Sequence, residues 1–244
     1  MSEKIKLGIK AGESATSKLA FRPSLEVNDG LNIGYLEVSV SKSEITPDSD
    51  WEFAGKTIPI LTFHFLGEKE PQAHHFETFK PISIKDIDKV KVIFDSMNKK
   101  IQHIMEVAGV PVETIEEILV NGLEFESTDT DHVITVFTEF FNKIEKAFNG
   151  DPKKKTNSVL IVNGKPQLFL FKLIRDYQRN KGKLVLPFFP GEGFIQKYVK
   201  GTKPVIKLDI TKETIKEREQ TQSNPFGTPN VNGSAMPAEF ADLK

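Results

Sequence analysis

The spacing of apolar residues changes twice along this chain of 244 residues, and the change limits the folds open to it. Between residues 31 and 82 apolar and polar residues alternate, as they do in Leu36–Val40, which is typical of half-buried strands. Between 83 and 150 the spacing is three or four residues, which predicts helices. The strand-like pattern returns after about 158. A helical block between two β segments predicts an α+β fold built around one sheet and one core.

Three helices are predicted in the central block. The first spans 83–108, where Ser83 and Asp86 resemble a capping box. A short helix over 112–120 and a third over 131–148 follow. The turn sequence Gly150-Asp151-Pro152 ends the block.

The flanking segments predict strands. Residues 31–82 read as a β-meander, and Asn163-Gly164 is a favoured pair for a tight hairpin turn between two later strands. The predicted strands cover 36–40, 58–66, 158–162, 168–174, 183–188 and 205–210.

The domain organisation follows from these elements. Residues 1–30, with scattered Gly, Ser and Thr, predict an N-terminal arm with one short strand at most. Residues 31–212 predict a single domain with the helical insertion at about 83–150; a division into two domains fits the pattern less well. Residues 213–244 predict a flexible tail, because 221–237 consists mainly of Asn, Pro, Gly, Ser and Thr with little to bury.

Several classes of function are excluded or disfavoured. Cysteine is absent, which removes disulfides, thiolate zinc sites and cysteine nucleophiles. Of the histidines, His64, His74 and His75 come nearest to a metal site, but adjacent residues of an extended chain point to opposite faces and no spaced carboxylate completes the set. We therefore expect no metal and no other cofactor. No nucleophile elbow, phosphate loop or Ser-His-Asp arrangement is recognisable, so we expect a protein without enzymatic activity.

The expected location is the cytoplasm. No stretch approaches 18 uncharged apolar residues, and the N-terminus lacks the apolar core of a secretory signal.

Charge is segregated along the chain, although the net charge is only -1. Residues 153–207 contain thirteen Lys or Arg and two acids, whereas residues 106–146 contain ten Glu or Asp and two Lys. Surfaces usually mix the two signs, so this separation points to a partner of strong negative charge for the basic segment.

Aromatic residues are interleaved with the cations of the basic segment, and this combination suits single-stranded nucleic acid. Cations neutralise phosphates and release counterions, while aromatic rings stack on bases of any sequence. The candidate phosphate contacts are Lys165, Lys172, Arg175, Arg179, Lys181, Lys183, Lys197 and Lys200. The candidate base-stacking residues are Tyr177, Phe189 and Tyr198.

Three points stay open at this level. In 168–176 one face carries Lys172 and the other carries Phe169 and Phe171, and the alternation does not decide which face is core. The loop 186–194 has two prolines and two glycines around aromatic rings, so it either clamps a nucleotide backbone or fills a corner of the core. Trp51, in an acidic turn, either stacks on a base or caps one end of the sheet, and the second is the more common arrangement.

The layout of the chain is similar to that of bacterial and phage single-stranded-DNA-binding proteins. Those proteins join a basic β domain through a flexible polar linker to a short terminal peptide that recruits replication partners. The resemblance implies the same part for a terminal peptide here that mixes acidic and apolar side chains, Glu239, Phe240, Asp242 and Leu243.

A second resemblance is carried by Phe169-Leu-Phe-Lys-Leu-Ile-Arg-Asp-Tyr, Lys183-Leu-Val-Leu-Pro, Phe194-Ile-Gln-Lys-Tyr and Trp51-Glu-Phe-Ala-Gly-Lys-Thr-Ile-Pro. These segments look like the diverged single-stranded-DNA-binding proteins of large tailed bacteriophages, including the crAss-like group. The resemblance covers about 35–70 and 158–200. It implies an OB-like antiparallel barrel or sheet with a helical insertion, and sequence-independent binding of single strands during DNA replication or recombination in a bacterial host.

Two other functions compete with DNA binding. A phage structural or assembly protein that mates its charged faces with other subunits explains the charge segregation equally well. A nuclease function fits the sequence less well, because most carboxylates, which would hold a catalytic metal, lie outside the basic segment. Within the DNA-binding hypothesis, the acidic helical block either faces away from the DNA or binds a neighbour's basic face, which would give self-association along the strand.

Overall fold

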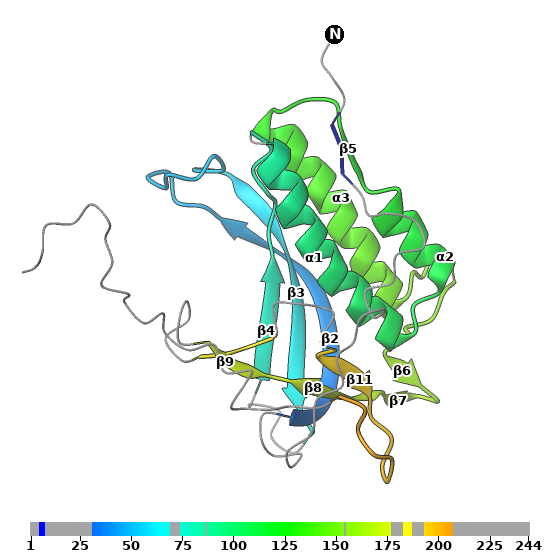
Figure 1. Cartoon of the computed structure of the whole chain (residues 1–244). Helices are drawn as coiled ribbons and strands as arrows, with labels where there is room; N and C mark the ends of the chain where they lie inside the picture. The colour runs from blue at the N-terminus through cyan, green and yellow to red at the C-terminus, as the bar shows by residue number, and fades with distance from the viewer. Residues whose placement is uncertain are drawn as a thin grey trace, which may run out of the picture.

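The computed structural model describes residues 5–7, 31–68, 74–85, 87–153, 155–176, 183–186 and 193–206. Its centre is a five-stranded antiparallel sheet of β2 (Leu31–Glu44), β3 (Thr57–Gly67), β4 (His74–Phe79), β8 (Leu168–Lys172) and β11 (Ile195–Lys197). Two long helices, α1 (Ile87–Ala108) and α3 (Thr130–Asn149), lie along one face of this sheet (Figure 1). The predicted α+β class, with helices inserted between two β segments, is confirmed.

The helical block matches the sequence prediction, except that the first helix begins at Ile87, so Ser83 to Lys85 precede it, and Asp86 of the predicted capping box lies outside the described residues. Between the long helices lie α2 (Val112–Ile115), the π-helix η1 (Glu116–Val120) and a short strand, β5 (Leu123–Phe125). The Asp129 side chain caps α3 by accepting hydrogen bonds from the backbone N–H groups of Asp131 and His132. β5 pairs with the N-terminal strand β1 (Ile5–Leu7). The rest of the predicted N-terminal arm and the predicted C-terminal tail lie outside the described residues.

The strands follow a Greek key. β2, β3 and β4 are consecutive neighbours, and β8 returns after the helical block to lie beside β2. This spatial order, in which the fourth strand lies beside the first, defines the motif. β11 then adds beside β8. The OB fold is a partly open Greek-key barrel of five strands. In the described part of the chain, however, β4 and β11 remain at separate edges, so the sheet does not close into a barrel.

Helix α3 covers the edge of β2 that a closing strand would otherwise pair with. Only residues 31–35 of β2 pair with β8, so its later residues have β3 on one side alone. There the Glu145 carboxylate accepts a hydrogen bond from the Val40 N–H at 2.9 Å. The Asn149 side-chain amide donates to the Val38 carbonyl at 2.8 Å. Side chains of a helix thus satisfy backbone groups of the strand.

Aromatic rings fill the core between the sheet and the helices. Phe63 of β3 packs edge-on against Phe148 of α3, with ring centroids 5.5 Å apart. Phe65 lies 5.2 Å from Phe171 of β8. Phe169 and Phe171 are 0% and 2% exposed. The open question about the face of 168–176 is therefore settled for these two rings, which belong to the core and do not reach a ligand.

Two strand predictions are wrong. Asn163-Gly164 does form a turn, but it joins only β6 (Ile161–Val162) and β7 (Lys165–Pro166). The next segment, β8, pairs with β2 instead of folding back on 158–162. Val205 and Ile206, predicted to begin the last strand, are not in a strand, and the rest of 205–210 lies outside the described residues. No strand was predicted for the segment that forms the edge strand β11.

Candidate nucleic-acid interface

The sheet surface opposite α1 and α3 is called the open face here. Because Phe63 packs on α3, its neighbours in β3 point away from the helices, and residues opposite them in the register share that face. On β2, β3 and β4 the open face includes Tyr35, Glu37, Ser39, Ser41, Ile60, Thr62, His64, Leu66, Phe76 and Thr78. It is thus a mixture of hydroxyl, aliphatic and aromatic side chains with one carboxylate.

Phe76 is the most exposed aromatic side chain in the described chain, at 54%. It stands on β4, an edge strand, directly opposite His64 of β3. His64 Nε2 lies 3.2 Å from Ser39 Oγ in a hydrogen bond, which holds the imidazole on the same face. A half-exposed aromatic ring beside polar groups offers an apolar surface on which a planar group can pack.

A short hairpin brings the positions of two basic residues near this edge of the sheet. β9 (Ile174–Asp176) and β10 (Lys183–Val185) pair so that Lys183 lies opposite Asp176 and Leu184 lies opposite Arg175. β10 lies close to β4 (Figure 1). The fold therefore brings the positions of Arg175 and Lys183 to the strand that carries Phe76, whereas the open face of β2, β3 and β4 has no Lys or Arg of its own.

The other described basic candidates lie toward the opposite edge of the sheet. Lys165 is exposed on the β6–β7 hairpin, and Lys200 is exposed in the loop after β11. Tyr198 is half-buried, and its backbone N–H donates to the Leu168 carbonyl at 2.9 Å. The structure therefore does not bring the predicted residues into one group. Outside the described residues lie Tyr177, Arg179, Lys181, Phe189, Glu239, Phe240, Asp242 and Leu243.

Lys172 does not occupy the surface position that was predicted for it. The Lys172 side chain is only 1% exposed, and Leu170 on the same face of β8 is 0% exposed. Both faces of this strand are therefore buried, with Phe169 and Phe171 on one face and Leu170 and Lys172 on the other. A phosphate on the protein surface would not reach the Lys172 ammonium in this structure.

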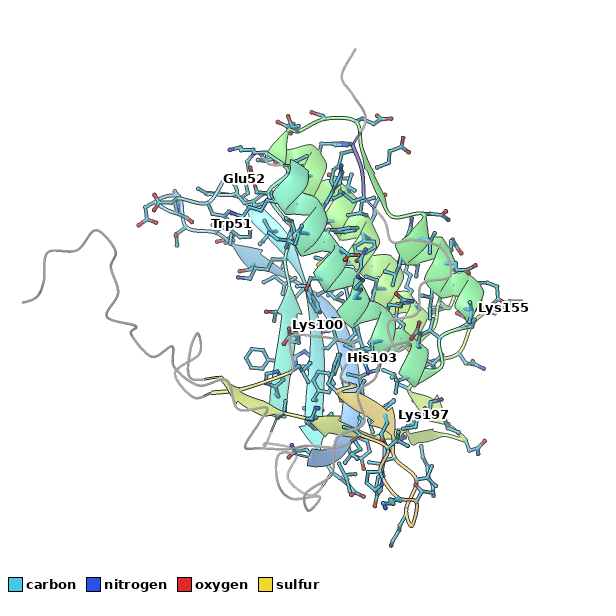
Figure 2. The ribbon with its side chains drawn as sticks, in the orientation of Figure 1. Trp51, Glu52, Lys100, His103, Lys155 and Lys197 are labelled. Carbon is cyan, nitrogen blue, oxygen red and sulfur yellow. The ribbon has the colours of Figure 1, made fainter. Side chains whose placement is uncertain are left out.

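Lys197 has a structural role that competes with phosphate binding. A β carbon built on Gly109, the residue that follows α1, would lie 2.9 Å from Lys197 Nζ. The last turn of α1 has no basic residue, so the ammonium of Lys197 supplies a cation at the negative end of this helix (Figure 2).

Trp51 caps one end of the sheet. It lies in the loop between β2 and β3 and packs edge-on against the buried Phe53, with centroids 4.8 Å apart (Figure 2). The neighbouring Glu52 forms an ion pair with Lys85 at 3.4 Å. These contacts bear out the more common of the two arrangements considered for this tryptophan.

A largely buried ion pair lies on the helix side of the sheet, away from the open face. Lys100 Nζ of α1 donates to Glu77 Oε1 of β4 at 2.7 Å, and His75 Nε2 lies 3.7 Å from the same carboxylate. Burial alone would raise the pKa of Glu77, but the hydrogen bonds and charges of His75 and Lys100 together lower it. This cluster joins α1 to the edge strand and thereby supports the strand that carries Phe76.

His103 makes the stability of the fold depend on pH. It is 1% exposed and packs edge-on against Phe194, and burial lowers its pKa from 6.5 to about 4. Between these values the unfolded chain binds a proton that the folded chain does not. The free energy of unfolding should therefore be highest above pH 6.5 and should fall, by on the order of 3 kcal/mol in all, as the pH approaches 4.

Urea unfolding at pH 7 and pH 5 measures this dependence. His103→Phe should remove most of the difference between the two pH values, and His103→Gln is the alternative if the larger ring does not fit. If the variant that folds still shows the wild-type difference in unfolding free energy between pH 7 and pH 5, the pH dependence arises from another group.

Within the described residues, no group of three or more His, Asp or Glu is arranged to hold a metal ion. A helix with the length and apolar character needed to cross a bilayer is likewise absent from this part of the chain.

Sequence reasoning missed Phe76 and His64. Their signal was present, because the alternation in His74-His75-Phe76-Glu77 places Phe76 on the face opposite Glu77. This alternation identifies Phe76 as an outward-facing residue only when the face covered by the helices is known from the structure. Comparison of the chain with known protein families, with curated proteins and with solved structures finds no match.

Proposed function

We propose that this chain binds single-stranded DNA without sequence preference, on the open face of the sheet beside the β9–β10 hairpin. The observation that carries the proposal is the half-exposed Phe76, which stands on an edge strand close to the backbone positions of Arg175 and Lys183. A ring and nearby cations are the two elements that single strands require, since the ring stacks on a base and the cations neutralise phosphates.

Two further features support the proposal. Hydroxyl groups of Ser39, Ser41 and Thr78 line the open face and are suited to hydrogen bonds with sugars, phosphates or base edges. The Greek-key order of the sheet is also the topology on which OB folds bind oligonucleotides. The setting would be DNA replication or recombination, in which single strands are exposed.

Binding should weaken steeply with salt. For the full chain and a labelled oligo-dT, fluorescence anisotropy should give a binding constant whose logarithm falls linearly with log salt, with a slope of about -0.7 for each phosphate neutralised. The double variant Arg175→Gln, Lys183→Gln should lower the affinity and make the slope shallower by about 1.4.

A matched control removes two charges elsewhere. Lys153 and Lys155 are exposed in the loop after α3, and Figure 2 shows Lys155 on the helical side of the molecule. Their replacement by Gln should change the slope much less. If the two double variants lose the same DNA affinity, binding depends on overall charge and not on the β9–β10 hairpin. No binding at low salt, together with assembly of the chain into particles or tubes, would favour a structural protein instead.

A further inference from the structure

The β6–β7 hairpin projects from the body with its apolar residues uncovered. Asn163 and Gly164 both have positive φ, 53° and 74°, which is the geometry of a tight hairpin turn. Neighbouring residues of a strand point to opposite sides, so a hairpin that lay flat on the protein would bury one of the pair Ile161 and Val162. Instead they are 53% and 51% exposed, and the hairpin extends away from the helices (Figure 1).

A hollow lies just beside the base of this hairpin. It has a volume of about 390 Å³ and is lined by residues of α2 and η1, by the last turns of α3 and by Asp151, Thr156, Asn157 and Val159. Ile118, Ala147 and Val159 contribute apolar side chains to its lining. Glu117 stands on its α2–η1 side, and Lys143 and Lys146 stand on its α3 side.

The hairpin and the hollow are consecutive in the chain, since Val159 lines the hollow and Ile161 stands on the hairpin. A surface that carries an apolar projection next to an apolar hollow is complementary to itself about a two-fold axis. The charges also match, because the hairpin carries Lys165 and the α2–η1 side of the hollow carries Glu117, with Glu113 and Glu116 exposed on the same two short helices.

We propose that the chain forms a two-fold dimer in which the β6–β7 hairpin of each copy inserts Ile161 and Val162 into the hollow of the other. Lys165 of each copy then meets the acidic α2–η1 side of its partner. This role for Lys165 differs from the phosphate contact predicted from the sequence. The dimer is independent of DNA binding, because its interface lies away from β4 and the β9–β10 hairpin.

Sedimentation velocity of the full chain without DNA tests the dimer. A species of twice the chain mass of 27.4 kDa is expected at micromolar concentrations. Val162→Glu should weaken dimerisation at least tenfold, because it places a carboxylate in the apolar hollow. Val92→Glu is the matched control, since Val92 is 71% exposed on α1 and lies outside the proposed contact. A wild-type chain that stays monomeric, or a Val162→Glu variant that dimerises normally, overturns the proposal.

A charge reversal tests the contact between the two copies. Lys165→Glu and Glu117→Lys should each weaken the dimer, and the double variant should recover most of the loss. A double variant as weak as the worse single variant contradicts the proposed pairing. Affinity for an oligo-dT too short to hold two copies should stay at the wild-type value in Val162→Glu, so failure of the dimer and failure of DNA binding are distinguished.

Discussion

Replacing Gly34 by alanine is expected to lower the free energy of unfolding by about 3 kcal/mol. Gly34 lies where β2 is paired on both sides, with β3 and with β8. A β carbon added there would clash with the backbone oxygen of Leu66 and lie 3.0 Å from the ring of Phe171. The oxygen belongs to a strand fixed in the sheet, so relief of the contact requires β2 and β3 to separate.

Urea unfolding followed by circular dichroism measures the loss. Gly55→Ala is the control: Gly55 has a positive φ of 70° but has no atom within 4 Å of an added β carbon, so it should cost only about 1 kcal/mol of backbone strain. If Gly34→Ala costs no more than Gly55→Ala, the close approach of the strands at Gly34 is not a constraint on the fold.

Replacing Phe76 by alanine should weaken oligo-dT binding roughly tenfold, because loss of one stacked base costs about 1 to 3 kcal/mol. Phe76→Trp should keep the affinity, because it preserves an aromatic surface at the same position of β4. Phe76→Leu should behave nearly like alanine, because an aliphatic side chain cannot stack on a base. Anisotropy titrations at one fixed salt concentration compare the four proteins.

Two controls separate stacking from a structural effect. Phe76 is 54% exposed, so its removal should change the free energy of unfolding by less than about 1 kcal/mol. Binding to duplex DNA should respond much less than binding to oligo-dT, since the bases of a duplex are already stacked on one another. Equal losses for both ligands, or full affinity in Phe76→Leu, would exclude base stacking at this position.

The helices could be predicted because their signals are local. The predicted helices over 83–108 and 131–148 correspond to α1 and α3, since spacings of three and four residues and caps such as Asp129 act within a few residues of one another. The partners of the strands depend on distant segments instead. The segment that became β8 was assigned to a hairpin with 158–162, yet it pairs with residues 31–35 of β2.

For the candidate site, too, some features could be predicted from the sequence and others could not. The sequence by itself determined the α+β class, the absence of cysteine chemistry and the strongly basic character of 153–207, because composition and short-range periodicity carry this information. Only the tertiary structure decided which aromatic rings are covered. It buried Phe169 and Phe171 under the helices, left Phe76 half-exposed on the opposite face and brought β10 beside β4. The physical reason is that a strand alternates between two faces, and only packing against another layer determines which of them meets water.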